Sequence, residues 1–163
     1  MKLRQWYQVH GAIEVSPHPT EMLEWLRPQV PGLGHDFEIR EGHWYAGSFR
    51  MFDASVPANL LHRWRPGEAG FLDIEGIENY VNGLPDEPHR DDILRKVRQT
   101  RQTVSLRGLA TFGASRLARI CEQLCGHLAR VSDGIIQVHQ DGFFSPMGES
   151  LFPHSPRHRL KTR

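Results

Sequence analysis

Hydrophobic residues follow two periods along this chain, one typical of helices and one typical of strands. Apolar residues recur at every third or fourth position in residues 20–28 and 115–131, which predicts an amphipathic helix in each segment. Aromatic and β-branched residues are concentrated in residues 6–15, which predicts an opening strand. The predicted buried stripe of the second helix consists of Leu117, Ile120, Cys121, Leu124, Leu128 and Val131.

Turn residues separate several pairs of short apolar segments. Residues 36–40 and 43–51 flank Glu41-Gly42, a pattern that favours a hairpin. Strands are also predicted from residue 102, at 135–139, and at 143–144 with a continuation at 151–152. Linkers of turn length between strands favour an α+β fold over a doubly wound parallel sheet. We therefore expect a single domain over residues 1–153, with an antiparallel or mixed sheet and two main helices packed on one face.

The middle of the chain gives weaker patterns. Residues 58–64 fit a short helix, and residues 69–74 fit a short strand around Phe71-Leu72. A further helix is predicted at 74–81. In residues 86–100, a narrow apolar stripe predicts at best a surface helix. Residues 154–163 carry four basic residues and no acid, so we expect a flexible basic tail.

Length and charge exclude several classes of protein. The chain has 163 residues, the size of one ordinary domain, and a formal net charge of +1. That balance argues against a protein that works by coating nucleic acid or anionic membrane. Apolar runs are far shorter than the roughly 20 residues that span a bilayer, and the N-terminus lacks a signal-peptide pattern. These features predict a cytoplasmic protein without a membrane partner.

The charge is concentrated in one region, residues 68–92, which we call the acidic segment. It holds eight acidic residues and one basic residue, Arg90. A run of carboxylates is usually a solvated surface, but it also steers a positively charged partner. Aromatic residues in or beside it are candidates either for the core or for anchors of an interface. The predicted partner-binding residues are Glu75, Glu78, Asp86, Glu87, Asp91, Asp92, Trp64, Phe71 and Tyr80.

Motifs that carry chemistry are weak in this sequence. Neither a P-loop nor a G-x-G-x-x-G motif after a strand is present. Cys121 and Cys125 lie four residues apart on one predicted helix face, which favours reduced core cysteines over a disulfide or a zinc site. We therefore expect that the protein is not an enzyme and that it has no catalytic residue, metal or cofactor.

Two alternatives remain at this point. His89 beside Asp91 and Asp92, or the pair His139 and Asp141, is compatible with a small metal-dependent hydrolase. Aromatic residues among arginines are compatible with base stacking in an RNA-binding module, although nucleic acid is not the expected partner. The residues of that hypothetical platform are Trp44, Tyr45, Phe49, Trp64, Arg40, Arg50, Arg63 and Arg65.

The end of the chain carries a recurring pattern, a helix of L-x-x-L-x-x-x-L-A form that runs into Gly and two apolar residues and then into an Asp-Gly-apolar turn. The segments are 117–129, Asp133-Gly134-Ile135-Ile136 and Asp141-Gly142-Phe143-Phe144. This ending resembles that of small stand-alone bacterial immunity proteins of polymorphic or type VI secreted toxin systems. The resemblance implies a stoichiometric inhibitor whose partner is a cognate toxin, expected here to be a basic effector domain. It implies no site residue.

Overall fold

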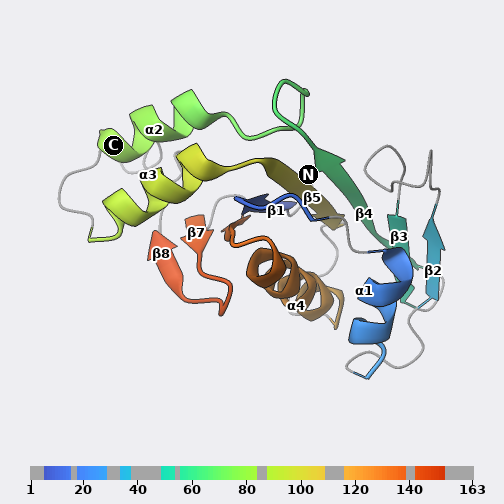
Figure 1. Cartoon of the computed structure of the whole chain (residues 1–163). Helices are drawn as coiled ribbons and strands as arrows, with labels where there is room; N and C mark the ends of the chain where they lie inside the picture. Colours follow the sequence, from blue (N-terminus) through green and yellow to red (C-terminus); the bar gives the residue numbers. More distant parts are fainter. Residues whose placement is uncertain are drawn as a thin grey trace, which may run out of the picture.

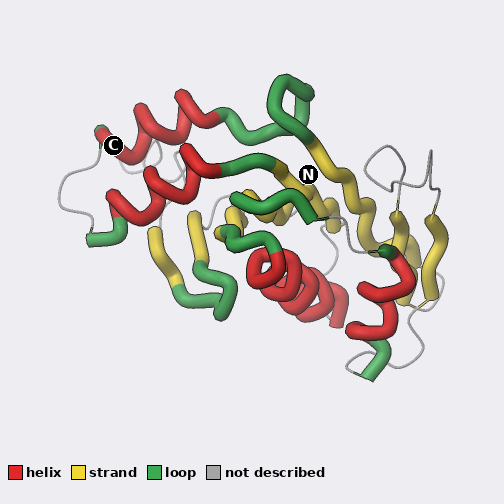
Figure 2. The backbone as a smooth tube through the Cα atoms, viewed as in Figure 1, coloured by secondary structure: helices red, strands yellow, loops and turns green. Residues whose placement is uncertain are grey.

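Eight antiparallel strands form one sheet in the computed structural model, which describes residues 6–15, 18–28, 34–37, 49–53, 56–83, 88–108, 116–138 and 142–152 (Figures 1 and 2). Their order across the sheet is β2-β3-β4-β5-β1-β6-β7-β8. The α+β single-domain prediction is confirmed, and the sheet is antiparallel rather than mixed in every described pair. The strands are β1 (Trp6–Gly11), β2 (Gly34–Phe37), β3 (Phe49–Asp53), β4 (Val56–Trp64), β5 (Gln102–Gly108), β6 (Ile135–Val138), β7 (Gly142–Phe144) and β8 (Ser150–Phe152).

Two helices cover the first face of the sheet, as the apolar periodicity predicts. They are α1 (Pro19–Leu26) and α4 (Arg116–Val131), which lie on the same side of β1 in Figure 1. His18 caps α1, because its Nδ1 atom accepts a hydrogen bond of 3.2 Å from the backbone of Thr20. The buried core of this face consists of Tyr7, Val9, Met22, Leu23, Leu26, Val104, Leu106, Cys121, Leu124, Cys125, Leu128, Ala129 and Ile136.

The predicted stripe of α4 is confirmed at Cys121, Leu124 and Leu128, which are buried. Val131 is different, because 41% of its surface is exposed at the end of the helix. Leu128, Ala129 and Ser132 around it are buried, so the buried stripe continues through Ser132 and leaves Val131 at its border. The predicted cap Ser115 and the side chains of Leu117 and Ile120 lie outside the described residues.

Two further helices lie side by side on the opposite, second face. They are α2 (Ile74–Asn82) and α3 (Arg90–Gln99) (Figure 1). Asp73 caps α2, since its Oδ1 atom accepts a 3.0 Å hydrogen bond from Gly76 N–H. The narrow stripe predicted for α3 is confirmed, and it packs into a second core made of Leu72, Val81, Ile93, Leu94, Val97, Ile135 and Phe143.

Two predictions for the middle of the chain are wrong. Residues 58–64 form no helix but belong to β4, which pairs with β3 on one side and β5 on the other. Hydrogen bonding to two neighbouring strands outweighs the weak local helical spacing. Residues 69–74 form no strand, because successive turns after β4 are closed by hydrogen bonds from Glu68 N–H to Arg65 O and from Phe71 N–H to Glu68 O.

The predicted hairpin is confirmed at its base, where β2 pairs with β3 from Gly34 opposite Phe52 to Phe37 opposite Phe49. Residues 38–48, which include the predicted Glu41-Gly42 turn, and the predicted basic tail at 154–163 lie outside the described residues. In the part of the chain that the structure describes, no helix has the length and apolar character needed to cross a membrane.

Candidate functional site

The second face of the sheet is polar where α2 and α3 leave it uncovered. The antiparallel register places His62 opposite Ser105, Ser105 opposite Gln8, and Gln8 opposite Gln137. Paired residues on adjacent strands project to the same side of a sheet, so these four side chains form one row across four strands. We call this row the polar ladder.

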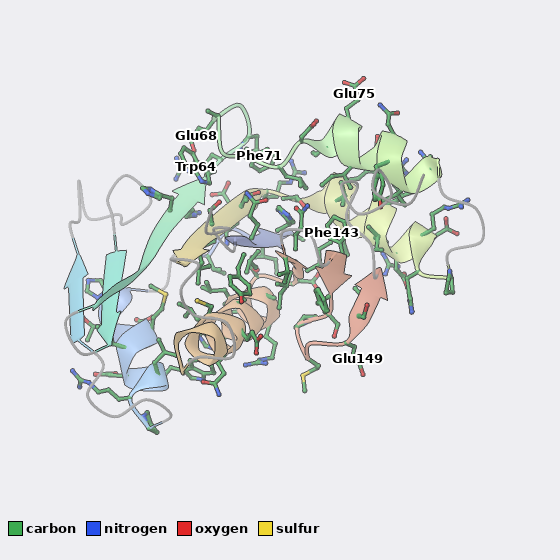
Figure 3. All side chains as sticks on the ribbon, turned by 180° about the vertical axis from the view of Figure 1, so that it is seen from behind. Trp64, Glu68, Phe71, Glu75, Phe143 and Glu149 are labelled. Carbon is green, nitrogen blue, oxygen red and sulfur yellow. The ribbon has the colours of Figure 1, made fainter. Side chains whose placement is uncertain are left out.

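A groove with a volume of about 470 Å³ lies over the polar ladder. Its floor is the sheet, and its wall is the segment that connects β4 to α2, together with the first turns of α2. Figure 3 shows Trp64, Glu68 and Phe71 close together along this wall. The groove is lined by Gln8, His62, Trp64, Ala69, Gly70, Phe71, Leu72, Asp73, Ile77, Ser105 and Gln137.

Trp64 is fixed in the wall by the close approach of Gly70. A Cβ atom at position 70 would lie 2.1 Å from Cε2 of the indole, so only glycine allows the loop to pack this closely. The imidazole of His62 lies beside the indole, with ring centroids 5.7 Å apart. Trp64 and Phe71, two of the predicted anchors, therefore line one groove although six residues lie between them in the sequence.

A buried histidine lies beside the floor of the groove, on the same face of the sheet as the polar ladder. Nε2 of His10 lies 2.9 Å from Oε1 of Gln137, and Nδ1 lies 3.1 Å from Oγ1 of Thr103. Because the carboxamide oxygen is an acceptor, Nε2 carries the proton and Nδ1 accepts from the threonine hydroxyl. Oγ1 of Thr103 in turn accepts a 3.2 Å hydrogen bond from Leu72 N–H, which ties the groove wall to the sheet.

The ionisation of His10 agrees with this arrangement. Complete burial lowers its pKa to about 4, and the hydrogen bond to Gln137 opposes that change only in part. The imidazole is therefore neutral at neutral pH and keeps one donor and one acceptor nitrogen. It donates to the Gln137 oxygen, and no described residue accepts a hydrogen bond from the NH₂ group of the same amide.

The neighbouring amide, Gln8, complements Gln137. Its Nε2 atom donates a 3.3 Å hydrogen bond to Oγ of Ser105, so its own oxygen is left to accept. The floor therefore presents amide donors from Gln137 beside an amide acceptor from Gln8, all of them uncharged. Asp73 is the acidic residue of the lining, and its Oδ1 atom is engaged in the cap of α2.

The other predicted partner-binding residues lie outside this groove, on α2 and α3. Glu75 is exposed on the first turn of α2 and points away from the sheet (Figure 3). Glu78 forms an ion pair with Arg98 across the two helices. Tyr80 is half-buried and packs against the second core. These placements divide the acidic segment into paired and exposed carboxylates.

On α3, Asp91 and Asp92 are both exposed. Asp92 forms an ion pair of 2.8 Å with Arg95, one turn further along the helix. The basic residues of α3 thus offset some of the charge that the sequence assigns to this region. Asp86 and Glu87 lie outside the described residues.

The described residues do not assemble the metal site that the sequence suggested as an alternative. His89, Asp91 and Asp92 are all described, yet no three His, Cys, Asp or Glu side chains in the described ranges come close enough to hold a metal ion. His139, Asp141, Trp44 and Tyr45 lie outside those ranges.

The hypothetical stacking platform is also divided between two faces. Arg63 is opposite Val104 and therefore on the first face, whereas Trp64 is opposite Thr103 on the second face. The buried Arg63 donates through Nε to Oε1 of Gln102 at 2.7 Å. The guanidinium of this arginine cannot interleave with the indole of its neighbour.

A second cavity of about 540 Å³ lies on the first face, between α4 and the turn that joins β7 to β8. Apolar side chains make up most of its lining, among them Ile136, Val138 and Phe144. Cys125 contributes to its wall, and burial raises the pKa of this thiol well above its ordinary value. Both cysteines are buried and form no disulfide, as the sequence predicts.

Sequence reasoning missed the polar ladder and His10. The available signal was the alternation of polar and apolar residues in β1, β5 and β6, which predicts one wet face for each strand. Alternation alone does not reveal that the three polar faces align, because alignment depends on strand order and register.

Comparison of the chain with protein-family models, with curated proteins and with solved structures finds no match.

Proposed function

We propose that this chain is a cytoplasmic, non-catalytic binding protein that neutralises a basic protein partner by stoichiometric binding. The observation that carries the proposal is the position of Trp64 and Phe71. These two aromatic residues line one groove, with the carboxylates of Glu68, Asp73 and Glu75 along the same segment. A concave site with aromatic anchors and a charged border is typical of protein interfaces.

The exposed carboxylates would supply the attraction for a basic surface. Glu78 and Asp92 have basic partners within the protein, so they contribute little net field. Glu75 and Asp91 are exposed and have no ion pair to a described residue, which makes them the main steering charges of the two helices. Asp86 and Glu87 lie outside the described residues, and the sequence alone includes them in the proposed surface.

The identity of the partner rests on the resemblance of the C-terminal segment to bacterial immunity proteins. An immunity protein occupies the surface of its cognate toxin and needs no reaction of its own. A basic toxin domain, such as one that acts on nucleic acid, would match the acidic surface. The carboxylates would then take the place of substrate phosphates.

Affinity purification of the tagged protein from its native host tests the proposal, with mass spectrometry as the readout. We expect one stoichiometric protein partner, whose recovery falls at high salt because charge attraction contributes to association. Recovery of the protein alone, or with nucleic acid only, would reject the proposal.

Charge reversal then tests the surface. With the purified partner, Glu75→Lys combined with Asp91→Lys should weaken binding at least about tenfold, mainly through slower association. The matched control reverses Glu122 and Glu149, two exposed carboxylates away from α2 and α3. Equal affinities for the two double variants would show that the acidic helices are not the docking surface.

A further inference from the structure

The groove over the polar ladder has the features of a small-molecule site, and we propose that it binds an uncharged planar ligand with an amide edge, of nucleoside size. Nucleobases carry this edge, in which a hydrogen-bond donor and an acceptor lie side by side. This ligand site shares Trp64 and Phe71 with the proposed partner surface, but it is inferred from the polar floor of the groove and does not depend on a protein partner.

The floor provides the complementary edge. Gln8 and Gln137 are directly opposite each other on β1 and β6, and both line the groove. No described residue takes up the Gln137 NH₂ group or the Gln8 oxygen as a hydrogen-bond partner. A ligand carbonyl would accept from Gln137, and the adjacent ligand N–H would donate to Gln8. In nucleic-acid recognition a single glutamine amide makes both contacts to the edge of a base, whereas here the donor and the acceptor come from two adjacent glutamines.

The donor on the floor is held in one orientation before a ligand arrives. The neutral imidazole of His10 fixes the Gln137 oxygen at 2.9 Å, and Thr103 fixes the other side of the imidazole at 3.1 Å. Rotation of the Gln137 amide by 180° would place NH₂ against the protonated Nε2 atom. A binding group whose orientation is fixed in advance loses less entropy when it binds.

The walls favour a planar ligand over a phosphate. Trp64 and Phe71 supply aromatic surface on one side of the polar floor, next to the imidazole of His62 in the ladder. The groove has a volume of about 470 Å³. This volume falls in the range of roughly 300–1,000 Å³ that is typical of small-molecule sites. Asp73 in the lining and Glu68 beside Trp64 place negative charge at the border, which disfavours a phosphate.

Nuclear magnetic resonance titration of the whole protein with uridine, cytidine, adenosine and guanosine tests the inference. We expect at least one nucleoside to shift the side-chain amide signals of Gln8 and Gln137. We also expect its 5′-monophosphate to bind more weakly. Absence of binding by all four at millimolar concentrations, or tighter binding of the monophosphate, would overturn the proposal.

Variants assign the contact to the floor. Gln137→Leu removes the donor and should weaken binding at least about tenfold. Gln99→Leu, on the exposed side of α3, is the matched control and should bind like the wild type. If Gln137→Leu does not fold, Gln8→Leu tests the same edge from the neighbouring strand. Unchanged affinity in a folded floor variant would place the ligand elsewhere and reject the site.

Discussion

The imidazole Nε2 of His10 and the carboxamide Oε1 of Gln137 lie 2.9 Å apart across the β1–β6 pair. The imidazole is fully buried, whereas the amide lines the groove on the second face. The contact therefore joins the buried imidazole of His10 to the carboxamide of Gln137, which a ligand in the groove can reach. Burial of the imidazole favours its neutral form, so the stability of the fold must depend on pH.

The pH dependence has a definite sign. Burial lowers the pKa of His10 from 6.5 to about 4. Between these values the unfolded chain binds a proton that the folded chain does not, so stability falls as the pH falls through this window. His10 alone should lower the free energy of unfolding by about 3 kcal/mol between pH 7 and pH 4.

Urea unfolding of the wild type and of His10→Gln at both pH values measures this effect. The variant keeps a side chain that donates and accepts but removes the titrating group. Its stability should therefore change less with pH than that of the wild type. The same pH dependence in both proteins would mean that His10 does not titrate as its burial requires.

The buried Arg63 provides a second prediction. Its Nε atom donates to Oε1 of Gln102 at 2.7 Å, and the same oxygen accepts a 3.1 Å hydrogen bond from Val15 N–H. Gln102→Leu removes this shared acceptor from a buried cation, which should cost about 3 kcal/mol of stability by chemical denaturation. Gln99→Leu, an exposed glutamine, should cost less than about 0.5 kcal/mol. A small effect at Gln102 would show that other contacts satisfy Arg63.

Two glycines should respond differently to alanine. A Cβ atom at Gly134 would lie 2.5 Å from the carbonyl oxygen of His10, a backbone atom that cannot move without separating β1 from the start of β6. Gly134→Ala should therefore cost about 3 kcal/mol. Gly67 has a φ of +90° in open space, so Gly67→Ala should cost only about 1 kcal/mol of backbone strain.

Thermal unfolding of both glycine variants, monitored by circular dichroism, compares the two effects. The Gly134 variant should have the lower midpoint of the pair. The reverse order would mean that β1 and β6 separate easily, and it would weaken the argument that the His10–Gln137 contact is rigid.

The cysteines should be inert in the folded protein. Cys121 and Cys125 are buried on α4, and burial raises the pKa of Cys125, so little of the reactive thiolate is present. Iodoacetamide should label neither residue under native conditions and both in denaturant, as read by mass spectrometry. Rapid labelling of the native protein would show that α4 opens on the timescale of the reaction.

Local periodicity was sufficient for the elements that bury one strong face. The stripe on α4 and the shorter stripe of Ile93, Leu94 and Val97 on α3 identified both helices, because an amphipathic helix carries its pattern within one segment. Short linkers also predicted an antiparallel or mixed sheet, and the structure shows that every described pair is antiparallel. Local patterns predicted the wrong element at β4. The spacing of apolar residues in 58–64 suggested a helix, but pairing with β3 and β5 makes this segment a strand.

The sequence by itself determined the α+β class, the segments that form helices, the buried cysteines and the presence of aromatic residues beside an acidic segment, but not that α2 and α3 form a layer on the second face. Only the tertiary structure decided that Gln8, Ser105 and Gln137, from three distant segments, form one polar ladder under Trp64 and Phe71. It also decided which carboxylates are paired, since the ion pair of Glu78 with Arg98 joins two helices. Strand order, register and helix packing depend on interactions between residues far apart in the chain, and no local pattern encodes them.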